Sequence, residues 1–105
     1  MYNELLSRAS RLEAFAASDP GNTALLRDLA QTWHGAGNHE KALAALDRLG
    51  VHEQASDAPL RGQLLLALGR WDEAARLFAA ALEGEPDAAP LWFNRGYALW
   101  AGGVS

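Results

Sequence analysis

Two short stretches of this chain decide its fold. Residues 37–42 read Gly-Asn-His-Glu-Lys-Ala, and residues 69–74 repeat that pattern as Gly-Arg-Trp-Asp-Glu-Ala. In each stretch the glycine and the polar residue after it signal a turn, and the residues that follow favour a helix. The pair therefore predicts a helix–turn–helix unit that occurs more than once.

The likeness extends beyond these stretches in both directions. Downstream, Leu46 corresponds to Phe78, and upstream, Trp33 corresponds to Leu65. A third copy follows the second, and in it Gly103 is the counterpart of the glycine at position 69. The distance along the sequence from position 37 to position 69 is the length of one repeat. Repeats of about this length are typical of proteins that stack one supersecondary unit several times.

Composition supports a helical chain. Alanine and leucine dominate, valine is scarce and isoleucine is absent, which leaves little material for strands. Asn22, Asn38, Asp57 and Asp87 stand where helix N-caps are expected. Turn signals and apolar stripes at helical spacing predict six helices, at residues 3–17, 23–35, 39–49, 58–68, 71–83 and 88–101.

The length and the net charge describe a small acidic chain. Its 105 residues carry a formal net charge of −4, which offers no positive surface to nucleic acid or to an anionic membrane. The absence of cysteine excludes disulfides and thiolate metal sites. The start does not resemble a signal peptide, and the apolar runs, such as residues 64–68, are far too short to span a membrane. We therefore expect a cytoplasmic protein, and the alanine-rich composition favours a GC-rich bacterial source.

The repeats resemble the tetratricopeptide repeat family, whose unit is two helices in about 34 residues. Members carry a large, a small and a large residue in the first helix of the unit. This chain has Leu26/Ala30/Trp33 and Trp92/Gly96/Leu99 at those positions, and Ala58/Gly62/Leu65 less closely. The small, bulky, small pattern of the second helix is matched by Ala74/Phe78/Ala81 and, more loosely, by Ala42/Leu46/Leu49.

The resemblance covers residues 20–103 and implies an all-α fold. The expected architecture is an α-α superhelix, a right-handed solenoid of antiparallel helix pairs with about six helices. We expect a single domain, residues 1–105, with a leading half repeat at 3–19, repeats at 23–54 and 55–88, and a trailing half repeat at 89–103.

The resemblance also implies a binding surface. In this family the first helices of successive repeats line a concave groove that holds a peptide or a partner protein. The corresponding positions here are Arg27, Gln31, His34, Gln63, Leu66, Asn94 and Tyr97, with Asp28, Leu60 and Phe93 beside them. The alternative is that these residues are simply the polar face of each helix. Asp28 and Leu60 depart from the basic clamp with which some members capture a terminal carboxylate.

No catalytic arrangement is recognisable in the sequence. The serines lie in no known motif, and no glycine-rich phosphate loop is present. His34, His39 and His52 lack the helical spacing and the acidic ligand of a metal site. We therefore expect no enzyme activity, no metal and no cofactor.

Two alternatives to groove binding remain open. Trp92, Phe93 and Trp100 lie on the last helix, for which no following helix is evident, and an exposed aromatic patch there favours a homodimer or larger self-associating scaffold. Alternatively, the chain is the N-terminal docking module of a longer multidomain protein or enzyme, because Gly103 stands where the turn to another helix is expected.

Overall fold

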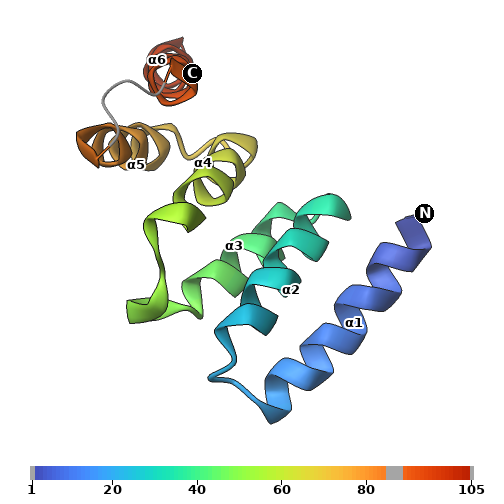
Figure 1. Cartoon of the computed structure of the whole chain (residues 1–105). Helices are drawn as coiled ribbons and strands as arrows, with labels where there is room; N and C mark the ends of the chain where they lie inside the picture. The colour runs from blue at the N-terminus through green and yellow to red at the C-terminus, as the bar shows by residue number, and fades with distance from the viewer. Residues whose placement is uncertain (1, 85–88, 105) are drawn as a thin grey trace. The chain divides into compact units, whose positions relative to one another are not determined.

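The computed structural model describes residues 2–84 and 89–104, with side chains placed for residues 3–83 and 94–103. Throughout this part the chain is helical and contains no strand (Figure 1). In chain order the elements are α1 (Tyr2–Ser18), α2 (Thr23–Gly35), α3 (His39–Asp47), the 3-10 turns η1 (Gly50–His52) and η2 (Ala55–Asp57), α4 (Ala58–Ala67), α5 (Trp71–Gly84) and α6 (Ala89–Val104). The predicted all-α class is confirmed.

The helices lie close to their predicted positions, although α6 extends to Val104 rather than residue 101 and the chain after α3 differs from the prediction. That helix was expected to reach residue 49 and instead ends at Asp47. Gly50 then adopts a φ of +54°, which an α-helix cannot contain. The backbone continues as the two 3-10 turns, which the sequence did not predict, before α4 begins at Ala58.

The two turns that repeat in the sequence have the same geometry. Gly37 has a φ of +82° and Gly69 a φ of +72°, the left-handed conformation that glycine adopts without strain. The next backbone N–H donates to the carbonyl five positions earlier, from Asn38 to Trp33 and from Arg70 to Leu65, each at 2.9 Å. The left-handed glycine and this backbone hydrogen bond end the helix and reverse the chain. The predicted helix–turn–helix unit is therefore confirmed in both copies.

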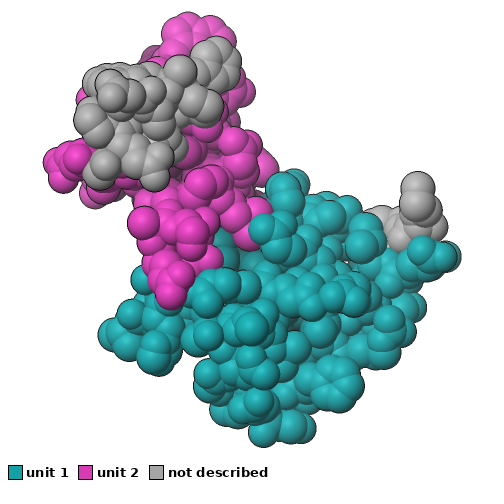
Figure 2. Space-filling model, in the orientation of Figure 1, with its two compact units in different colours: residues 1–53 teal, residues 54–105 magenta. Residues whose placement is uncertain are grey.

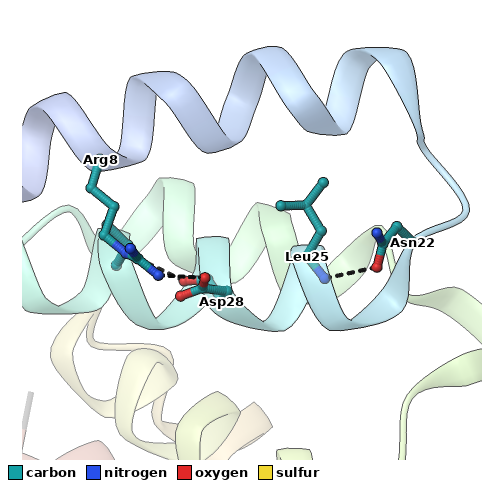
Figure 3. Close-up of polar contacts among 5 residues, drawn as sticks. Arg8, Asn22, Leu25 and Asp28 are labelled. Carbon is teal, nitrogen blue, oxygen red and sulfur yellow. Dashed lines mark hydrogen bonds and ion pairs between the residues drawn. The ribbon is translucent and has the colours of Figure 1, made fainter.

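The predicted N-caps have three different outcomes. The side-chain oxygen of Asn22 accepts from the Leu25 backbone N–H at 3.1 Å, as Figure 3 shows. That of Asn38 accepts from the Lys41 backbone N–H at 3.1 Å, so both caps are confirmed. Asp57 precedes α4 but does not cap it, because its carboxylate accepts instead from the Gln54 backbone N–H at 2.8 Å. The predicted cap at residue 87 lies outside the described residues.

The chain divides into two compact units, Met1–Glu53 and Gln54–Ser105 (Figure 2). In the first unit α2 packs against α1 and α3, and the three helices run alternately up and down (Figure 1). In the second unit α5 packs against α4 and α6. The predicted arrangement as a single domain of half and whole repeats stays a prediction.

Each unit has an apolar interior built from small and large residues. Trp33 is 5% exposed, as expected for a core position. In the second unit the fully buried Phe78 of α5 lies against Gly62 of α4, where a Cβ atom would overlap the ring. Further buried residues are Ala9, Leu12, Leu26, Leu29, Ala30, Leu43 and Leu46 in the first unit and Leu64, Leu65, Ala74, Leu82, Ala98 and Ala101 in the second.

Candidate functional site

The groove positions predicted in the first unit follow one face of α2. Arg27, Gln31 and His34 are spaced by four and three positions, so they lie on the same side of the helix. Gln31 is exposed and the other two are half-buried. The Arg27 guanidinium donates to the His52 carbonyl oxygen at 2.9 Å, so part of its hydrogen-bonding capacity is used within this unit.

Asp28, beside these positions, is engaged with α1. Its carboxylate pairs with the Arg8 guanidinium at 2.5 Å, as Figure 3 shows. The Arg8 Nε atom also donates to the Thr32 hydroxyl, at 3.4 Å. The hydrogen bond and the charge of Asp28 raise the pKa of Arg8 above its usual value, so this guanidinium remains charged. The pair is partly exposed and its main effect is to orient α1 on α2.

A second polar contact joins three segments of the first unit. The Trp33 indole N–H donates to the Glu13 carboxylate at 3.1 Å, and Arg48 pairs with the same carboxylate at 3.3 Å. Lys41 lies over the Trp33 ring, with its Nζ 4.5 Å from the ring centroid. Sequence reasoning missed this cluster because its members lie far apart in the chain and follow no spacing rule.

Two of the three histidines meet at the turn between α2 and α3. The rings of His34 and His39 are 5.8 Å apart between centroids. Both Nδ1 atoms are buried and have no hydrogen-bond partner among the described residues. Within that same part of the chain, no three histidine, aspartate or glutamate side chains are grouped closely enough to hold a metal ion.

The groove positions predicted in the second unit lie on two helices. Gln63 of α4 is exposed, and Leu66 and Leu60 are half-buried. On α6, Asn94 is half-buried and Tyr97 is exposed. The complete groove would draw on both units, so it stays a prediction, and the structure gives only the exposure of each predicted position within its own unit.

An aromatic row lies on the surface of the second unit. Tyr97 of α6 meets the edge of Trp71 of α5 at 6.1 Å and the ring of Trp100 at 6.3 Å between centroids. Trp71 lies near Gly69 of the turn before α5 and also packs on α6, where a Cβ at Gly102 would lie 3.0 Å from the Trp71 Cβ. Trp100 is 65% exposed, while the side chains of Trp92 and Phe93 lie outside the described residues.

Two open hollows accompany these surfaces. One, of about 360 Å³, lies beside Trp71 and is lined by charged side chains at the start of α5, including the paired Arg70 and Glu73, whose closest atoms are 2.7 Å apart. The other, of about 250 Å³, lies on α1 and is lined by Asn3, Glu4, Ser7 and Arg11. Neither hollow was predicted, because the sequence does not show which surface side chains stand apart.

Comparison with known families identifies the chain. A tetratricopeptide repeat model matches residues 7–59 and 60–103, which is most of its length. The chain belongs to the tetratricopeptide repeat family, whose fold is a superhelix of antiparallel helix pairs and whose members generally mediate protein–protein interaction. No curated protein matches the chain. None of the described helices combines the length and the apolar character needed to cross a membrane.

Proposed function

We propose that this chain is a protein-interaction module that binds a peptide or a partner protein through the concave face of its repeats. One observation supports this most directly. Gln31 and Gln63, at corresponding groove positions of α2 and α4, are both exposed, although each helix buries its other side in its own unit. Polar side chains on rigid, well-packed helices suit recognition, because little conformational entropy is lost on binding.

The chemistry of these positions favours an extended polypeptide as the ligand. Gln31, Gln63 and Asn94 carry side-chain amides, each able to donate and to accept hydrogen bonds. An extended peptide presents alternating N–H and C=O groups that such amides can pair with. Tyr97 adds an apolar ring with a polar tip beside them. In this proposal the chain acts by binding alone, without catalysis or a cofactor.

A comparison of captured partners tests this proposal. The immobilised wild-type protein and the triple variant Gln31→Ala, Gln63→Ala and Asn94→Ala are incubated with lysate of the source cells, and the bound proteins are quantified by mass spectrometry. Arg27 is left intact because it holds the His52 carbonyl. We expect the partners enriched by the wild type to be lost from the variant.

The matched control changes an exposed surface of α1 instead. The triple variant Ser7→Ala, Ser10→Ala and Arg11→Ala alters exposed residues of that helix that lie outside the predicted groove. It should retain the wild-type set of partners. An identical set for the wild type and the groove variant would refute the groove as the binding surface.

A second candidate function is self-association through α6. The observation that favours it is the exposure of Leu99 and Trp100, at 53% and 65%, on one helix. Large apolar side chains grouped on a surface usually mark an interface. This candidate does not exclude groove binding, because it uses a different face of α6 from Asn94.

A further inference from the structure

The turn between α2 and α3 brings two histidines together. His34 is the next-to-last residue of α2, and His39 is the first residue of α3. Their ring centroids lie 5.8 Å apart and the ring planes are inclined by 51°, so the rings are close without stacking. The expectation of no metal site rested on the spacing of histidines along one helix. That spacing does not apply to these two residues, because they lie on opposite sides of a turn.

Each of the two rings has a nitrogen atom without a partner. The Nδ1 atoms of His34 and His39 are buried, and neither forms a hydrogen bond with a described residue. In the described part of the chain, no other buried side-chain nitrogen or oxygen lacks a partner. Buried polar atoms are normally paired with a protein group, a water or an ion, because leaving them unpaired is costly. Since both unpaired atoms belong to neighbouring rings, we interpret them as the two halves of one binding site.

The chemistry of two imidazoles indicates the kind of ligand. A neutral histidine offers a lone pair at one ring nitrogen, and such a nitrogen is the commonest protein ligand of copper, nickel and zinc ions. Bonds of about 2 Å from one ion to two imidazole nitrogens place the ring centroids about 5–6 Å apart. The observed 5.8 Å lies within that range. A bridging water would lie at the longer hydrogen-bond distance from each nitrogen and would hold the rings further apart.

The surroundings of the pair set the strength of binding. Among the described residues, no third histidine, aspartate or glutamate is grouped with the two rings. Structural and catalytic zinc sites use three or four protein ligands, so a site with two is weaker and water completes the coordination. Both histidines are only half-buried, so movements of their side chains can admit an ion and its water ligands. The net charge of −4 also favours the approach of a cation.

We infer that His34 and His39 together bind one divalent transition-metal ion, with water as its remaining ligands. Copper(II) binds most tightly, because nitrogen ligands of this kind prefer it to nickel and zinc. The ion joins the end of α2 to the start of α3 and so stabilises the first unit. This inference goes beyond the proposed groove and does not depend on it, because the metal ion alone is the probe.

Calorimetric titration of the intact chain with copper(II) tests the inference. The wild type is compared with His34→Gln, His39→Gln and the matched control His52→Gln, which removes the exposed third histidine. Glutamine keeps a neutral polar side chain at each position, and circular dichroism verifies the fold. We expect one copper site whose dissociation constant rises about tenfold or more in either of the first two variants and is unchanged in the control.

Nuclear magnetic resonance of the histidine rings provides a second measurement that needs only the wild-type chain. Zinc, which is diamagnetic, is added in steps while the ring signals of the three histidines are followed. We expect the signals of His34 and His39 to shift together, at the same zinc concentrations, and the signal of His52 to stay in place. This measurement decides the question if a glutamine variant fails to fold.

Three results would overturn the inference. Without any copper binding, a bridging water is the better partner for the two buried nitrogens. Binding that is unchanged in His34→Gln and His39→Gln places the ion elsewhere on the chain. Equal weakening in all three variants shows a general affinity for histidine side chains. None of these results bears on the groove, whose test changes Gln31, Gln63 and Asn94 instead.

Discussion

Helices α4 and α6 present the same short pattern to different surroundings. Each has a glycine followed three positions later by a leucine, as Gly62 and Leu65 on α4 and as Gly96 and Leu99 on α6. Leu65 is 3% exposed and Leu99 is 53% exposed. The difference arises because α5 covers α4 on this side, whereas no described helix covers α6 there. The pattern therefore specifies a surface suited to helix packing, and the neighbouring helix decides whether that surface becomes core.

The comparison can be broken most strongly by removing the Phe78 ring that packs against Gly62 of α4. We expect Phe78→Ala to lower the free energy of unfolding by about 3–5 kcal/mol, because Phe78 is fully buried and its loss leaves a cavity. Phe15→Ala, at a side chain that is 61% exposed, should change it by no more than about 0.5 kcal/mol. Urea unfolding followed by circular dichroism measures both. Similar losses for the two variants would contradict the packing described for α5.

A methyl group at position 62 gives the next largest effect. Gly62→Ala places a Cβ where the Phe78 ring lies, so the ring or the helix must shift. We expect a loss of about 1–3 kcal/mol in the free energy of unfolding, the usual cost of overpacking a core. The same urea experiment measures it. An unchanged or increased stability would show that the two helices are further apart than the structure has them.

The turns before α3 and α5 differ in how the following helix begins, and this difference gives a smaller effect. Asn38 caps α3 through the Lys41 backbone N–H, whereas Arg70, at the corresponding position before α5, bonds the carboxylate of Glu73 instead. We expect Asn38→Ala to lower the free energy of unfolding by about 1 kcal/mol, the usual value of an N-cap. Arg70→Ala removes only an exposed ion pair and should cost well under about 1 kcal/mol. Calorimetry measures the loss of stability in both variants. Equal losses would contradict the cap at Asn38.

The corresponding glycine of α6 gives a change of opposite sign. Gly96 lies inside α6, and no described residue lies within 4 Å of a Cβ placed there, so alanine adds helix propensity without a clash with them. We expect Gly96→Ala to raise the free energy of unfolding by about 0.5–1 kcal/mol. The measurement is made at a protein concentration low enough to keep the chain monomeric. A destabilisation like that of Gly62→Ala would mean that another side chain packs against Gly96.

Local patterns predicted much of this fold, because they depend on residues close together in the chain. The glycines of the two turns, the capping asparagines and the apolar stripes each follow from spacing within a short segment. Asp57 was misread for a related reason. Its position before a helix is that of a cap, but the 3-10 turn around it brings the Gln54 N–H closer to its carboxylate.

The contacts that the sequence could not predict join distant segments. The pairing of Arg8 with Asp28 and the shared carboxylate of Glu13 depend on how α1 lies against α2 and α3, which no short pattern encodes. For the candidate groove, the family resemblance supplied the positions. The structure added that the Arg27 side chain is already hydrogen-bonded and that an aromatic row begins beside Tyr97.

Chemical labelling tests the central comparison most directly. The chain contains no cysteine, so Leu65→Cys and Leu99→Cys each introduce one thiol at corresponding positions of α4 and α6. Reaction with a thiol reagent is followed at low protein concentration, with the unfolded proteins as the reference. We predict that the thiol at position 99 reacts nearly as fast in the folded as in the unfolded chain, and that the thiol at position 65 reacts only on opening of the α4–α5 pair. Equal protection at both positions would contradict the account.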